Sequence, residues 1–77
     1  MIDELADVVL VGDLPKYGLA AGDIGTVVLV HKSGAGYEVE FTTLAGDTIA
    51  VVTLSASQVR EAESSEIAHA RELARAV

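Results

Sequence analysis

Strict alternation of apolar and acidic side chains is the feature that most constrains this chain. Tyr37, Val39 and Phe41 alternate with Glu38 and Glu40, which is the period of an extended strand with one buried and one solvated face. Other short runs of Val, Ile, Leu and Thr are separated by turns rich in glycine and aspartate. Such turns join antiparallel neighbours, so the chain is predicted to be mostly β.

Five short strands are predicted from these runs. They are expected over residues 5–11, 24–31, 37–42, 48–54 and 59–60. A long first loop contains the only proline, and one tight turn precedes the last strand. Closing short strands into a barrel hides the edges of the sheet. The predicted fold is therefore a small five-stranded SH3-like barrel over residues 1–60, with an OB-type barrel as the main alternative.

The remaining residues, 61–77, are predicted to form a C-terminal α-helix. Apolar residues recur there at or beside helical spacing: Ile67, Ala70, Leu73, Ala74 and Val77. The second and fourth strands are apolar on both faces, whereas a barrel interior takes one face of each strand. A short helix is marginal alone in water, so this one is expected to cover its own barrel or to pack on another subunit.

Charge and composition limit the classes of partner. The net charge is −7 and the five basic residues are scattered, which disfavours nucleic acid and anionic membranes. The absence of cysteine removes disulfides and thiolate metal sites and is compatible with a cytoplasmic location. The chain is 51% hydrophobic with few aromatic residues, so part of its aliphatic surface is expected to be buried against a protein partner or another copy.

No catalytic, metal-binding or cofactor-binding residue is predicted. Glu38 and Glu40 share one strand face and are expected to be solvated, because nothing near them supplies a third ligand. His31 and His69 are too far apart in the sequence for a zinc signature. The glycine turn around Asp23 lacks the lysine and helix of a phosphate-binding loop. The chain is therefore not expected to be an enzyme.

The best candidate for partner binding is the first loop, because binding residues concentrate on loops held by a scaffold. It offers a proline, a base and an aromatic side chain: Pro15, Lys16 and Tyr17. The alternative is structural, with Leu14 and Leu19 plugging the end of the barrel and Tyr17 packed beside them. A second candidate surface is the apolar side of the tail: Ile67, Leu73 and Val77.

Several segments together resemble a known family. They are VVL at 8–10, DLPKYGL at 13–19, GDIGTVV at 22–28, YEVEF at 37–41, VTL at 52–54 and QVR at 58–60. This pattern is similar to that of small bacterial proteins catalogued as domain of unknown function 4926. The resemblance implies an SH3-like fold, carries over no established activity, and suggests an accessory or antitoxin-like companion of a neighbouring gene product. It stops after Arg60, so it says nothing about the tail.

The function predicted from the sequence is a non-catalytic protein-interaction module. The alternative is a self-assembling structural protein, in which the tail or an exposed sheet face seals an oligomer. An RNA-binding barrel is less favoured. The GDIGTVV segment at 22–28 is similar to turns of ribosomal and transcription-factor barrels, but the acidic charge opposes RNA.

Overall fold

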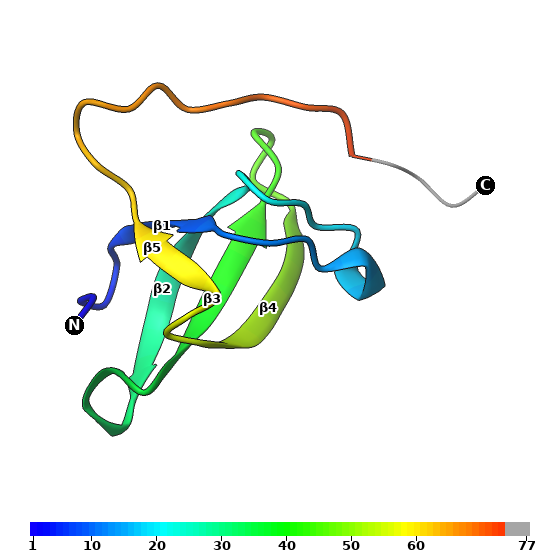
Figure 1. The fold of residues 1–77 in the computed structure, drawn as a ribbon. Coiled ribbons are helices and arrows are strands. Elements are labelled where there is room, and N and C mark those ends of the chain that lie inside the picture. Colours follow the sequence, from blue (N-terminus) through cyan, green and yellow to red (C-terminus); the bar gives the residue numbers. More distant parts are fainter. Residues whose placement is uncertain (74–77) are drawn as a thin grey trace.

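The computed structural model describes residues 1–73 and consists of one five-stranded antiparallel sheet. The strands are β1 (Asp7–Leu10), β2 (Ile24–His31), β3 (Gly36–Thr42), β4 (Thr48–Ser55) and β5 (Val59–Glu61). Their order across the sheet is β4-β3-β2-β1-β5 (Figure 1). Two short 3-10 turns, η1 (Pro15–Tyr17) and η2 (Lys32–Gly34), lie in the connections. The prediction of a mostly β chain with five antiparallel strands is confirmed.

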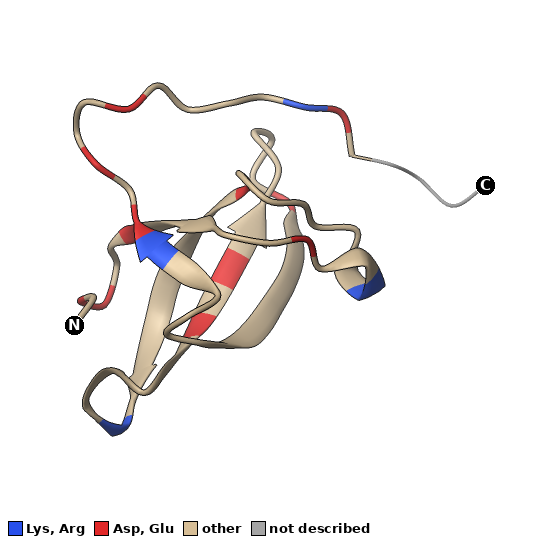
Figure 2. Ribbon diagram, viewed as in Figure 1, with Lys and Arg blue, Asp and Glu red and all other residues tan. Residues whose placement is uncertain are grey.

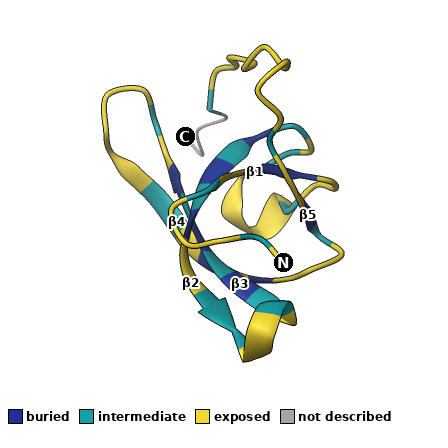
Figure 3. Ribbon diagram, turned by 90° about the vertical axis from the view of Figure 1, so that its left-hand side faces the viewer, coloured by how far each residue is buried: buried dark blue, intermediate teal, exposed yellow. Residues whose placement is uncertain are grey.

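The interior follows the alternation of β3. Tyr37, Val39 and Phe41 are almost completely buried, and Glu38 and Glu40 face outwards. The rest of the core is aliphatic and comes mainly from β1, β2 and β4, with one residue each from the first loop and β5 (Figure 3): Val8, Leu10, Leu19, Val27, Val52, Leu54 and Val59. Every strand and every one of these core residues lies at or before Glu61, so residues 62–73 contribute neither a strand nor a residue to this core.

A β-bulge in β2 changes which of its side chains face inwards. Val27 pairs with Val39, but Leu29 rather than Val28 pairs with Glu38. One extra residue therefore opposes the partner strand, and Val28 and Leu29 are both exposed, by 39% and 45%. The apolar run of this strand therefore does not alternate regularly between the two faces beyond Val27.

The predicted C-terminal helix is not formed within the described residues. From 62 onwards the chain has only a turn at its start, and it then runs without helix or strand over one end of the sheet (Figure 1). Ile67 is 96% exposed, Ala70 is exposed and Leu73 is only partly buried, so the apolar residues at or beside helical spacing gain too little burial to offset the cost of helix nucleation. Ala74 and Val77 lie outside the described residues.

The outer face of the sheet therefore keeps exposed apolar side chains. Val28 and Leu29 on β2 and Val51 on β4 are at least one-third exposed. The prediction that a tail helix covers this face is wrong, because residues 62–73 pass over a different part of the molecule. Across residues 1–73, no helix has the length and apolar character that crossing a membrane requires.

Candidate functional site: a groove beneath the tail

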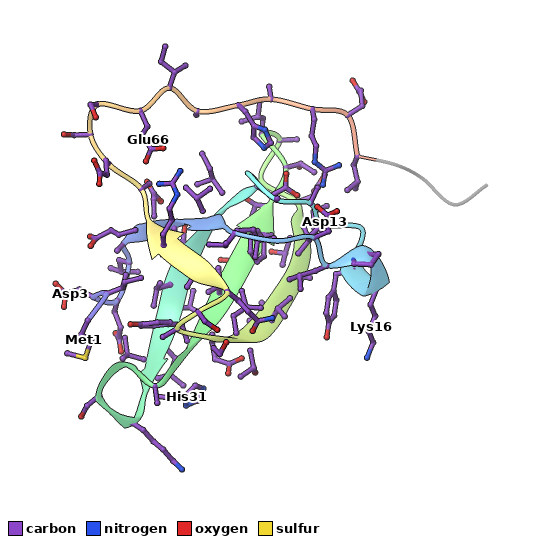
Figure 4. The ribbon with its side chains drawn as sticks, in the orientation of Figure 1. Met1, Asp3, Asp13, Lys16, His31 and Glu66 are labelled. Atoms are coloured by element: carbon purple, nitrogen blue, oxygen red, sulfur yellow. The ribbon has the colours of Figure 1, made fainter. Side chains whose placement is uncertain are left out.

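The beginning of the tail is fixed to β5 by an ion pair. The two terminal guanidinium nitrogens of Arg60 donate to the carboxylate of Glu66, each at 2.7 Å. The same carboxylate accepts from the backbone N–H of Glu63 at 2.8 Å, which closes a turn. Glu66 points from the tail back towards the sheet (Figure 4). These bonds direct the following residues across the end of the sheet instead of away from it.

Asp23, between the first loop and β2, is the only buried charged residue of the described chain. Its backbone N–H donates to the carbonyl of Ala20, and its own carbonyl accepts from Leu10. One carboxylate oxygen accepts from the N–H of Ala20 at 2.9 Å. Residues of β1 and the first loop thus hold the backbone and one carboxylate oxygen of Asp23.

Two side chains of the tail bind this carboxylate. Arg71 donates from Nε to Oδ1 of Asp23 at 2.7 Å and from one terminal nitrogen to Oδ2. The same terminal nitrogen lies 2.9 Å from the carbonyl oxygen of Gly18, to which it donates. Nε2 of His69 lies 3.1 Å from Oδ1 of Asp23. The forked contact of Arg71 suits a planar guanidinium, whereas an ammonium group could not reproduce it.

Two glycines with positive φ angles lie beside the docked tail, and Gly22 leaves room for the ring of His69. Gly22 has φ +94°, and a Cβ there would lie 3.2 Å from the ring of His69. Gly18, at the end of η1, has φ +71° and exposes the carbonyl that Arg71 uses. Positive φ angles favour glycine, so the GL and GD pairs of the loop shape the surface on which the tail lies.

A groove of about 640 Å³ separates the tail from the end of the sheet. Its apolar floor includes Leu19, Phe41 and Ile49, and the turn between β3 and β4 forms a further wall. Residues 68–73 form the opposite wall. A second hollow, of about 380 Å³, lies beside it under residues 62–69. The tail therefore spans the groove and leaves much of it open.

The arginine also sets the protonation of the site. Hydrogen bonding from Arg71 is the main cause that lowers the pKa of Asp23 below its ordinary 3.8, with the Ala20 N–H and His69 adding to it against the opposing effect of burial. At the start of the tail, Arg60 and the Glu63 N–H lower the pKa of Glu66 from 4.5 to about 2. Both carboxylates are therefore ionised at neutral pH.

Acidification should release the tail. Because both folded-state pKa values are lowered, the contacts stabilise the docked tail above the ordinary values and are lost as the pH falls through the folded ones. Backbone amide resonances of residues 66–73 should therefore shift between pH 4.5 and about 2. Methyl resonances of Val39 report whether the core persists. If the resonances of the tail stayed unchanged down to this pH while the core remained intact, the ion pairs at Asp23 and Glu66 would not be the contacts that dock the tail.

The outer face carries a separate polar cluster. Glu38 accepts from the hydroxyl of Thr53 at 2.6 Å and lies 2.6 Å from Nε2 of His31. The hydrogen bond from Thr53, followed by that from His31, lowers the pKa of Glu38. Glu40 accepts from Thr48 at 2.7 Å. Within residues 1–73 no three His, Asp or Glu side chains gather as metal ligands would. The remaining charges are dispersed (Figure 2).

The residues predicted to bind a partner are not brought together. Pro15, Lys16 and Tyr17 form η1, where the ammonium of Lys16 lies 5.7 Å from the centre of the Tyr17 ring. Leu73 lines the groove on the tail side, and Ile67 is solvent-exposed. Val77 lies outside the described residues. The role of these residues in binding stays a prediction.

Sequence reasoning missed Asp23 and Arg71 as a pair. Their separation by 48 positions in the sequence hid the contact, and the turn around Asp23 had a sufficient local explanation. The available signal was that arginine is sparse in an acidic chain and Arg71 falls in the tail that was expected to dock. The assumption of a helix placed Arg71 on the face expected to be solvated.

Comparison with known proteins gives one match. A family model described as Domain of unknown function (DUF4926) matches residues 4–61. No curated protein and no solved structure matches the chain. The match includes all five strands and Asp23 but ends before Glu66, His69 and Arg71. The chain therefore belongs to the family of domains of unknown function DUF4926.

Proposed function

We propose that this chain is a non-catalytic protein-interaction module built on an SH3-like barrel, with the groove beneath the tail as its binding site. A meander from β1 to β4, with β5 returning to β1, is the order expected of such a barrel and favours it over the OB alternative. The described residues offer a groove with an apolar floor and one oriented carboxylate. This combination suits binding better than catalysis.

One observation supports the proposal. The carboxylate of Asp23 and the tail side chains that bind it lie in different parts of the chain. Asp23 lies inside the matched domain, whereas Arg71 and His69, which bind its carboxylate, lie outside it. A buried carboxylate left without partners is unfavourable. The domain therefore carries a site that an extended segment satisfies, and in this protein the tail is one such segment.

Adding the tail as a separate peptide tests whether the groove binds extended segments. The protein would be the chain ending at Glu61, which retains every strand and core residue. A peptide of residues 62–73 should shift the backbone resonances of Leu19, Asp23 and Ile49, because these residues line the groove. Resonances of Leu29 and Thr53, on the outer face, should not move.

A version of this peptide with alanine at position 71 is the matched control, and it should bind at least about tenfold more weakly because it loses charge-assisted hydrogen bonds. Two results would count against the module: no shift at millimolar peptide, or shifts confined to the outer face.

Self-assembly is the second candidate, and the edge strand β4 favours it. This strand is eight residues long, contains no charged residue or proline, and pairs only with β3 among the described strands. An uncharged edge offers free backbone groups to another strand, and Val51 within this strand is 54% exposed. Light scattering at micromolar concentration would show a dimer or larger species, and a monomer of 8.0 kDa would exclude this candidate.

A further inference from the structure

We infer that the groove recognises arginine in an extended segment of another protein, and that the chain's own tail competes with this partner for the same carboxylate. The inference rests on the proposed function. It adds that the partner presents an arginine, and that the docked tail reduces binding of this partner. It is supported by the arrangement of hydrogen-bond acceptors around Asp23 and by the high solvent exposure of the docked tail.

The carboxylate of Asp23 is prepared for a guanidinium before any occupant arrives. The N–H of Ala20, which is not part of the tail, fixes its orientation, and with the tail docked its side chain is 11% exposed. The carbonyl of Gly18 offers a further acceptor to the terminal nitrogen of Arg71 that reaches Oδ2 of Asp23. Two oxygens of one carboxylate and one carbonyl together match the planar fork of donors on arginine. Lysine would place a single point charge there.

The tail fills the rest of the groove poorly. Every residue from 63 to 72 is exposed, and Leu73 is only partly buried. The space of about 640 Å³ between the tail and the apolar floor persists with the tail docked. Alanines at 68 and 70 form part of the tail's wall. A segment with larger apolar side chains beside its arginine would bury the fully exposed Leu44 and more of the partly buried Ile49 at the edge of the groove, and so displace the tail.

Covalent attachment favours binding of the tail over binding of a separate partner, because it keeps the tail close to the groove. The pair between Arg60 and Glu66 holds the start of the tail beside the groove, and a short tether corresponds to an effective concentration on the order of millimolar. The docked tail weakens any partner by a factor of about one plus this concentration divided by the intrinsic dissociation constant of the tail, so a tail that binds at about 0.1 mM would weaken a partner about tenfold. Release of the tail should therefore be visible as a gain in partner affinity.

The test uses the full chain with its tail released. His69→Ala, Arg71→Ala and Leu73→Ala together remove the side chains that hold the tail in the groove. A random-peptide display library would be selected on this variant, and the enriched peptides measured by fluorescence polarisation. Comparison chains are the wild type and the released variant carrying Asp23→Asn. Asp47→Asn is the matched control, because its exposed side chain makes no hydrogen bond in residues 1–73.

Enriched peptides should share an arginine and bind wild type at least about tenfold more weakly than the released variant. Asp23→Asn should cost about tenfold or more, and Asp47→Asn should change nothing. Peptides without arginine that still shift groove resonances would overturn the inference and leave the module intact. Equal affinity for wild type would overturn the competition.

Failure to enrich any peptide overturns the inference alone if residues 62–73 still bind the chain ending at Glu61. It overturns both proposals if they do not. Circular dichroism checks that the released variant is folded. If it is not, the chain ending at Glu61, which lacks the same three side chains, takes its place.

Discussion

Phe41→Ala should destabilise the domain by about 3–5 kcal/mol, enough to leave much of the chain unfolded at 25 °C. Phe41 is 2% exposed, and it is both part of the core and part of the floor of the groove. Its removal therefore loses buried apolar area and leaves a cavity. A domain of this size has only about 3–5 kcal/mol to lose. Urea unfolding followed by circular dichroism measures the change.

Leu44→Ala is the matched control for this substitution. Leu44 is also a large apolar residue that lines the groove, but its side chain is fully exposed. Its truncation should change the free energy of unfolding by no more than about 0.5 kcal/mol. Similar losses for both variants would mean that Phe41 is not buried as described.

Gly25→Ala should have the second largest effect, with a loss of about 1–3 kcal/mol or more. A Cβ at this position would lie 2.5 Å from Cγ1 of Val39, 2.8 Å from the Phe41 ring and 3.0 Å from the carbonyl oxygen of Glu40. Val39 is completely buried, so its methyl group has no free space to move into, and the strand backbone must shift instead. Thermal unfolding would report the loss as a lower midpoint.

Gly12→Ala supplies the comparison for Gly25. A Cβ at Gly12 would meet nothing within 4 Å, and its φ lies outside the positive region. The substitution should be neutral or slightly stabilising, because alanine restricts the unfolded chain. If both alanines proved neutral, the close approach of β2 to β3 at Gly25 would be wrong.

Local patterns predicted the strands because their signals are short-range. The alternation around Val39 and the glycine turns need no knowledge of distant residues, and β2 and β3 were placed to within a residue. The bulge at Val28 was missed because a run of four apolar residues fits either face. Only its pairing with β3 decides which of them face the core.

The tail was mispredicted because helical spacing is weak evidence in an alanine-rich segment. Periodicity reports which residues would share a helix face, but the helix forms only if that face is buried. Here Arg71 and Glu66 form ion pairs with Asp23 and Arg60, and Ile67 stays in solvent. The pair between Arg71 and Asp23 joins residues 48 positions apart, and no local pattern specifies which carboxylate an arginine of the tail will bind, so the groove could not be predicted.

Because the strands and the core lie outside the tail, the tail and a partner can replace one another in the groove rapidly. No residue of the tail contributes to the core, so undocking needs only the contacts at Asp23 and Glu66 to break and leaves all strands paired. Movements of this kind occur in nanoseconds to microseconds, as for loops and termini, and do not wait for global opening. The identity of the groove's occupant would then follow changes in partner concentration almost immediately.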